Sequence, residues 1–227
     1  MSFHPITFGN ENLPDPYVYS YTPSHDEPPV LSKVENMHIP KVRRAGLIFY
    51  TIIKDKLYMC FGRDAKTYEL TDFGGGRHQK ESPIKTAVRE GNEESRLVFG
   101  KITPESIGSF YGLYDKDMLI VFVPVVGPDN LIINCTSYNF HNKTHLTLKQ
   151  KKNKAYNELS GIVWLDEEQL NHVFSEAPGY RMYDKVRKFF CMCEEFAQSA
   201  VIMKNILKTT TYVPGCLQNR AFVQITK

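Results

Sequence analysis

Runs of apolar residues alternate with polar turns along this chain and predict a folded domain over residues 41–207. The run at 44–54 is continuously apolar and of strand length, and a polar step at Asp55 and Lys56 separates it from a second run at 57–63. Further strands are predicted at 69–73, 107–115, 118–126 and 158–165. Strands that are interrupted by helix-length segments indicate an α/β fold.

Three helices are predicted from capping residues and apolar spacing. Ser82 is a favourable N-cap and Pro83 suits the first helical position, which predicts a helix over 83–95. A short helix is predicted to begin at Asp166. Apolar residues at helical spacing between 179 and 207 predict one long amphipathic C-terminal helix.

Three segments lack this order. Residues 1–40 hold 7 of the 13 prolines and predict an irregular N-terminal arm. Residues 127–157 are rich in lysine and predict a long basic connection inserted into the domain. Residues 208–227 are predicted to form a C-terminal tail.

Carboxylates at fixed offsets follow a triple glycine and carry the strongest chemical signal. On a helix, Glu90 and Glu94 lie one turn apart with Glu93 alongside, and three acids so close repel one another. A hard divalent cation with oxygen ligands would relieve this repulsion, which predicts Mg²⁺ or Mn²⁺. The positions that form the pattern are Gly75, Glu81, Arg89, Glu90, Glu93 and Glu94.

This spacing resembles the Nudix box, G-x5-E-x7-R-E-U-x-E-E-x-G-U, in which U is a bulky aliphatic residue. Six of the seven fixed positions match, while Gly91 stands in place of the first U and Arg96 in place of the glycine that ends the helix. The resemblance covers roughly residues 41–207. It implies the Nudix fold, an α/β fold in which a mixed β-sheet is sandwiched between α-helices.

The resemblance also implies an enzyme that cleaves a phosphoanhydride within a nucleoside diphosphate linked to another group. Its metal ligands would be Glu90, Glu93, Glu94, the carbonyl of Gly75 and, in a supporting role, Glu81. Arg89 would fix the helix and the preceding segment by pairing with Glu81 or a neighbouring carboxylate. The general base would be either a carboxylate of the box itself or an acid from a later loop, for which Glu158 is the candidate.

The charge of the chain is compatible with a polyanionic substrate. Its net charge is +3 and its calculated pI is about 8.5. Arginines beside the first strands and lysines of the basic connection are candidates for phosphate contacts, and ordinary solvated surface charge is the alternative. These candidates are Arg44, Arg63, Lys149, Lys151, Lys152 and Lys154.

The substrate is less sharply indicated than the reaction. The triple glycine resembles that of diphosphoinositol polyphosphate phosphohydrolases, but basic residues rather than acidic ones follow it here. The Glu93-Glu94-Ser95-x-Leu97 ending resembles viral Nudix proteins that remove mRNA caps, so capped RNA is the preferred expectation. Dinucleoside polyphosphates and other nucleotides are alternatives, and a non-catalytic Nudix binding module is the alternative from another class.

The cysteines and the absence of long apolar stretches set the expected location. The chain has five cysteines, an odd number without a framework spacing, which predicts reduced thiols in a cytoplasmic protein. The N-terminus does not resemble a secretory signal, and no stretch of 18 apolar residues predicts a membrane span. The oligomeric state is left open.

Overall fold

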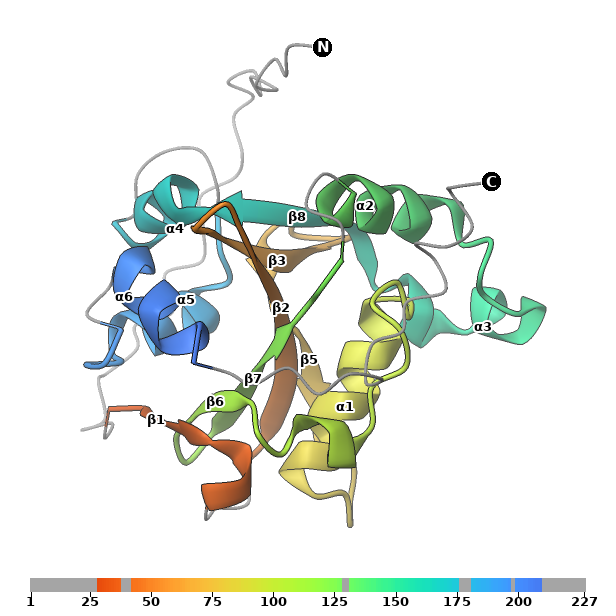
Figure 1. The fold of residues 1–227 in the computed structure, drawn as a ribbon. Coiled ribbons are helices and arrows are strands. Elements are labelled where there is room, and N and C mark those ends of the chain that lie inside the picture. Colours follow the sequence, from red (N-terminus) through yellow and green to blue (C-terminus); the bar gives the residue numbers. More distant parts are fainter. Residues whose placement is uncertain (1–27, 38–41, 128–130, 176–180, 197–198, 210–227) are drawn as a thin grey trace.

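The computed structural model describes residues 28–37, 42–127, 131–175, 181–196 and 199–209 (Figure 1). Most of the predicted arm and most of the predicted tail lie outside these residues. The described part contains one central sheet with helices on both of its faces.

The sheet has eight strands and mixed pairing. The strands are β1 (Val30–Lys33), β2 (Arg44–Ile53), β3 (Lys56–Asp64), β4 (Leu70–Thr71), β5 (Phe73–Gly76), β6 (Tyr111–Tyr114), β7 (Met118–Pro124) and β8 (Leu159–Asp166). They run in the order β1-β6-β7-β2-β3-β4, with β5 paired to β2 and β8 paired to β3. The β2–β7 pair is parallel, and the other pairs of named strands are antiparallel.

Strand β2 changes its partner halfway along one edge. Its first half, residues 44–47, pairs with β5, and its second half, residues 49–53, pairs with β3. Because β7 pairs with β2 over residues 44–50, both partners must use the opposite edge of β2. The sheet therefore splits between β5 and β3, and this split gives room for a cleft.

Helices cover both faces of the sheet. They are α1 (Pro83–Glu94), α2 (Ile132–Asn142), α3 (Leu148–Lys152), α4 (Glu167–Phe174), α5 (Asp184–Cys191) and α6 (Ala200–Leu207), with short 3-10 turns η1 (Val34–Asn36), η2 (Pro104–Ile107) and η3 (Lys154–Asn157). Figure 1 shows α1 and α2 on one side of the sheet and α4, α5 and α6 on the other. This arrangement confirms the predicted mixed sheet between helices.

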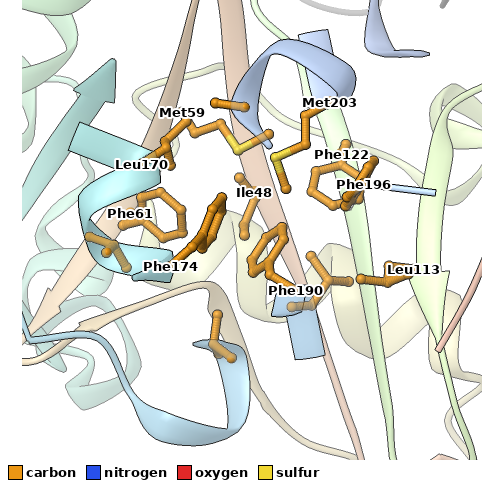
Figure 2. Close-up of a cluster of buried hydrophobic side chains, with 14 of the residues drawn as sticks. Ile48, Met59, Phe61, Leu113, Phe122, Leu170, Phe174, Phe190, Phe196 and Met203 are labelled. Carbon is orange, nitrogen blue, oxygen red and sulfur yellow. The ribbon is translucent and has the colours of Figure 1, made fainter. Parts of the chain in front are cut away.

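Two hydrophobic cores lie on the two faces. Successive side chains of a strand point to opposite faces, so Leu47 and Phe49 join the core beneath α1, whereas Ile48 and Tyr50 join the core beneath α4–α6. Figure 2 shows the second core, in which phenylalanines from β3, α4 and α5 meet Ile48 and Met203. The continuous apolar run of β2 thus reflects a strand that is buried on both sides.

The prediction of one long C-terminal helix is wrong. The segment forms two short helices, α5 and α6, because Phe190, Phe196 and Met203 all enter the same core (Figure 2). A straight helix over 184–207 would be about 36 Å long and would carry one end away from this core.

The prediction of a long connecting loop at 127–157 is also wrong, because this segment contains α2, α3 and η3. Helix α2 buries Ile132, Thr136 and Phe140 at helical spacing, and Trp164 of β8 donates a hydrogen bond to the Thr136 hydroxyl at 3.0 Å. Its start has no side-chain cap and its sequence is mostly polar, so the usual helix signals are weak.

The prediction of an irregular N-terminal arm is wrong for residues 28–37, the part of this arm that the structure describes. Strand β1 pairs with β6 in register from Val30 opposite Tyr114 to Lys33 opposite Tyr111. Backbone hydrogen bonds at a sheet edge need no strong apolar pattern, which explains why residues 30–33 show no strand signal.

Two further expectations concern cysteines and membranes. The four described cysteines, Cys60, Cys135, Cys191 and Cys193, form no disulfide with one another. In the described part of the chain, every helix is too short or too polar to serve as a membrane span.

Candidate active site

The helix that carries the predicted metal ligands begins as expected. The Ser82 hydroxyl accepts a hydrogen bond from the backbone N–H of Lys85, and Pro83 occupies the first turn. The triple glycine does not form a turn, because Gly74, Gly75 and Gly76 are paired residues of β5. Glycine here allows other residues to pack closely against the strand, and it does not serve to reverse the chain.

Gly75 lets α1 place a carboxylate directly over β5. A Cβ atom at Gly75 would lie 2.6 Å from the carboxyl carbon of Glu90, far inside contact distance. Any side chain at this position would therefore displace Glu90 from the strand. The carbonyl of Gly75 and the Glu90 carboxylate are thus held on the same small patch of the site.

Arg89 contacts three of the box carboxylates. Its guanidinium contacts Glu81 at 3.0 Å, Glu90 at 2.7 Å and Glu93 at 3.4 Å, and it also donates to the carbonyl of Gly76 at 3.2 Å. The expected pairing of Arg89 with Glu81 is therefore present. Much of the repulsion that predicted a metal ion is relieved by this arginine.

Hydrogen bonds from Arg89 and Thr86 lower the pKa of Glu81 to about 2. Because the folded pKa lies below the ordinary value of 4.5, the interaction stabilises the fold above pH 4.5, and the stabilisation is lost as the pH falls towards 2. We expect Glu81→Gln to lower the free energy of unfolding at pH 7 by about 2 kcal/mol. The difference from the parent protein should shrink towards zero near pH 2.

Urea unfolding of both proteins at several pH values between 7 and 2.5 measures this effect. Glu35→Gln, at an exposed position in η1, is the matched control and should change stability little at any pH. A Glu81→Gln deficit that stayed constant across this range would contradict the assigned cause.

Glu94 is the carboxylate that Arg89 leaves without a direct partner. Its side chain is buried, and its Oε2 atom has no hydrogen-bond partner among the described residues. Burial raises the pKa of Glu94 well above its ordinary value, and the charges of Asp72 and Glu90 raise it further. Burial likewise raises the pKa of Glu90.

Arg44 is held by groups of the protein itself. Its guanidinium pairs with the fully buried Asp72 at 2.6 Å and donates to the carbonyl of Gly74 at 2.8 Å. Burial alone would lower the pKa of Arg44, but Asp72 raises it above the ordinary value. Asp72 was not predicted as a site residue, because its only sequence signal is a single acid within a strand-like segment.

Of these groups, Arg44, Gly74 and Glu94 line one wall of a cleft of about 310 Å³ at the split in the sheet. Its lining does not include the other residues of the predicted box, which are Gly75, Glu81, Arg89, Glu90 and Glu93. Its lining includes four carboxylates and a single guanidinium, together with Tyr183 and threonines. The charged lining residues are Asp64, Glu69, Glu94, Glu158 and Arg44. An excess of carboxylates attracts cations, so an anionic substrate needs added positive charge to enter this cleft.

Glu158 is brought into the same cleft as Glu94, although the two are far apart in the sequence. Its side chain is exposed, which makes it accessible to water. The charge of Glu158 contributes to the raised pKa of Glu90, so the two carboxylates interact electrostatically. The structure thus places the candidate base beside the box carboxylates.

The remaining candidates lie elsewhere. Arg63 is half-buried in β3, Lys149, Lys151 and Lys152 belong to α3, and Lys154 begins η3. Within the described part of the chain, none of these five residues lines the cleft. Any contact of the lysines with substrate would therefore involve a part of the substrate outside the cleft.

The residues present fit a divalent cation. In the described ranges, no three histidine, cysteine, aspartate or glutamate side chains already have the spacing of a metal site. However, Glu94 has an unsatisfied buried oxygen, Glu90 lies one turn away, and the backbone of β5 is within reach of both. A hard cation that prefers carboxylate and carbonyl oxygens matches this donor set.

Comparisons with known proteins give only distant likenesses. No protein-family model and no curated protein matches the chain. It is similar to a C. elegans Ap4A hydrolase in a binary complex, with 16% identity over 65% of this chain and 92% of that chain and a TM-score of 0.39. It is also similar to the M. smegmatis Nudix hydrolase RenU, with 12% identity over 75% of this chain and 88% of that chain and a TM-score of 0.36.

A MutT/nudix family protein from Enterococcus faecalis has 13% identity over 58% of this chain and 45% of that chain, with a TM-score of 0.31. At these TM-scores the likeness is too distant to decide an activity. The assignment of function therefore depends on the site itself.

Proposed function

We propose that this protein is a divalent-cation-dependent pyrophosphohydrolase that cleaves a phosphoanhydride in a nucleoside diphosphate-linked substrate. The observation that carries the proposal is Glu94, a buried carboxylate with an unsatisfied oxygen at the wall of an acidic cleft. Burial of a carboxylate oxygen without a hydrogen-bond partner is costly, and a bound cation would remove the cost.

Each residue of the site has a defined part in this proposal. Glu90, Glu94 and the carbonyl of Gly75 would hold the cation, with Glu93 and Glu81 in support. The cation would supply positive charge that neutralises the phosphate oxygens of the substrate. Arg89 keeps the carboxylates of α1 in place through its contacts with Glu81, Glu90 and Glu93.

Glu158 is the proposed general base. It would take a proton from a water molecule whose oxygen attacks one phosphorus of the P–O–P bridge. The bond from that phosphorus to the bridging oxygen breaks, and the bridging oxygen leaves with the other phosphate. The exposed position of Glu158 at the cleft supports this role, because the attacking water arrives from solvent.

For the substrate, we propose capped RNA, with dinucleoside polyphosphates as the alternative. The support comes from α3 and η3, which precede Glu158 and carry four lysines. Among the described residues, none of these lysines forms an ion pair with a carboxylate. Free cations on the segment that leads to Glu158 are suited to a polyanion that extends beyond the cleft.

The test is hydrolysis by the purified protein with Mg²⁺ or Mn²⁺. Cap-labelled RNA, free cap dinucleotide, a dinucleoside polyphosphate and an inositol pyrophosphate would be compared, each with and without a chelator. We expect cation-dependent release of methylated GDP from RNA. Turnover of the small molecules alone would reject decapping, and no turnover of any substrate would favour a binding module.

The lysines give a second prediction. We expect the triple variant Lys149→Gln, Lys152→Gln, Lys154→Gln to raise KM for capped RNA of about 30 nucleotides roughly tenfold at low salt. The slope of log KM against the logarithm of the salt concentration should decrease by about 2, because fewer counterions are released when RNA binds. The KM for cap dinucleotide should not change, since the lysines lie outside the cleft.

The matched control changes the exposed lysines Lys54, Lys101 and Lys185 to glutamine, which alters the net charge by the same amount. It should leave both KM values near those of the parent. Equal effects of the two triple variants would show that net charge, rather than α3 and η3, determines RNA affinity.

A further inference from the structure

Arg96 is a buried arginine bound to backbone oxygens rather than to an acid. It follows Glu94 by two residues and is 5% exposed. Its Nε donates to the carbonyl of Tyr156 at 2.8 Å, and its two Nη atoms donate to the carbonyls of Phe140 at 2.9 Å and Leu159 at 2.7 Å. Its guanidinium also lies 3.9 Å from the centre of the Phe140 ring.

This arrangement is unfavourable for Arg96 itself. Burial lowers the pKa of its guanidinium to about 10, and no described carboxylate forms an ion pair with it. Its backbone has a φ of 54°, a left-handed conformation that favours glycine. The stabilisation that offsets this cost must come from the hydrogen bonds to the three carbonyls, because buried carbonyls need partners.

Two of the three carbonyls flank Glu158. Tyr156 precedes Glu158 by two residues and Leu159 follows it directly, so the guanidinium holds the backbone on both sides of this residue. The third carbonyl belongs to α2. One side chain therefore joins the end of α1, which carries Glu94, to the segment that carries Glu158.

The contacts around Arg96 make this segment a single unit. The backbone carbonyl of Arg96 lies 2.5 Å from Nε2 of His145, and Asn157 donates hydrogen bonds to the carbonyls of Lys151 at 3.1 Å and Asn153 at 2.9 Å. The η3 turn packs directly against α1. Residues 143–157 are thus fixed to α1 from both the backbone and the side chain of Arg96.

We propose that Arg96 is a positioning residue that fixes Glu158 at the cleft, facing the carboxylates of α1. This role depends on the proposed function, because it assigns Glu158 the part of general base. Arg96 itself does not line the cleft. Its effect on turnover is therefore exerted through the backbone around Glu158.

The experiment is a double-mutant cycle of Arg96→Lys with Glu158→Gln, in the full chain with Mn²⁺. Lysine keeps the positive charge, but its single ammonium nitrogen cannot reach all three of the carbonyls that three different nitrogens of the guanidinium contact. We expect Arg96→Lys to lower kcat by about 30-fold with less than a threefold change in KM. In the Glu158→Gln background the same change should lower kcat less than twofold.

A second measurement is independent of turnover. Hydrogen–deuterium exchange of residues 154–159 should become at least tenfold faster in Arg96→Lys, while exchange in β2 and β7 stays at the parental rate. If the lysine variant does not fold, Arg96→Gln takes its place, since it removes the charge that burial disfavours.

The outcomes are distinct. Losses that multiply in the double variant, or unchanged exchange at 154–159, would overturn the role of Arg96 while leaving the proposed function intact. Absence of turnover in the parent protein would overturn the proposed function and the positioning role together. Non-additive losses with faster exchange at 154–159 support the proposal.

Discussion

Glu94→Gln is expected to abolish hydrolysis and, without divalent cations, to make the protein more stable. The loss of activity should reach about 10³-fold, because a cation ligand is removed from the site. The gain in stability should be about 2 kcal/mol at neutral pH, because glutamine avoids the burial of a charge beside Asp72 and Glu90. Opposite changes in activity and stability identify a residue retained for function rather than for folding.

The pH dependence of stability follows from the same group. The folded pKa of Glu94 lies well above its ordinary value of 4.5, so the folded protein holds this proton more tightly than the unfolded chain. The contribution of Glu94 to stability is therefore greatest below pH 4.5 and is lost as the pH rises through the window between 4.5 and the folded pKa. This loss should be absent from Glu94→Gln. Arg44 opposes the raised pKa but does not cancel it.

Thermal unfolding with a chelator and with excess Mn²⁺ measures both effects. The parent protein should gain stability when Mn²⁺ is added, because the cation binds only the folded state, and Glu94→Gln should gain much less. Glu35→Gln, at an exposed position in η1, is the control and should behave as the parent. Retention of activity within tenfold of the parent, or a parent protein that does not respond to Mn²⁺, would contradict the assignment.

The variant Glu93→Gln separates the loss of activity from the gain in stability. We expect it to abolish turnover as well, because Glu93 belongs to the same carboxylate set. Its side chain is 23% exposed and lies 3.4 Å from Arg89, so its charge is not buried without a partner. The variant should therefore lose activity without becoming more stable, unlike Glu94→Gln.

A feature of this fold could be predicted when the residues that determine it lie close together in the sequence. Strand β2 and helix α1 were predictable because an apolar run and a Ser82–Pro83 start are local signals. The partners of Arg44 and Arg96 were not, because Asp72 lies 28 residues from Arg44 and the carbonyls bound by Arg96 lie 44 to 63 residues away. A backbone carbonyl carries no side-chain signal, so a sequence pattern cannot reveal it.

The same limit explains how Arg96 was interpreted. From the sequence, Arg96 was identified only as the residue that stands in place of the glycine that ends the helix. The structure shows that Arg96 does adopt the left-handed conformation and that its side chain bonds three carbonyls. Helix α2, which provides one of these carbonyls, was itself predicted as a loop, so its contact could not be foreseen.

Gly91, the other departure from the box, is expected to be required for packing. A glycine within a helix normally costs about 1 kcal/mol relative to alanine. Gly91→Ala would therefore stabilise α1 if no other residue packed against position 91. Here a Cβ atom would lie 2.2 Å from Cδ1 and 2.6 Å from Cγ of Leu47 in β2. The severe contacts are with Cγ and Cδ1 of Leu47, whereas its Cβ, at 3.2 Å, is only a tight contact, so relief requires Leu47 to move within a closely packed core.

We therefore expect Gly91→Ala to lower the free energy of unfolding by about 2 kcal/mol, the usual cost of overpacking a core. Gly91→Ile, which restores a bulky aliphatic residue at this position of the box, should lower it further. Leu47 already fills the space on β2 that such a side chain would enter. The glycine and the leucine thus form a complementary pair across the interface between α1 and β2.

Removal of the leucine side chain should reverse the sign of the glycine substitution. Leu47→Ala alone should cost about 3 kcal/mol, because it opens a cavity in the core. In that background, Gly91→Ala has room for its methyl group and should stabilise the protein by up to about 1 kcal/mol. Urea unfolding of the four proteins of this cycle decides the matter. A stabilising effect of Gly91→Ala in the parent, or equal effects in both backgrounds, would show that Leu47 does not require glycine at position 91.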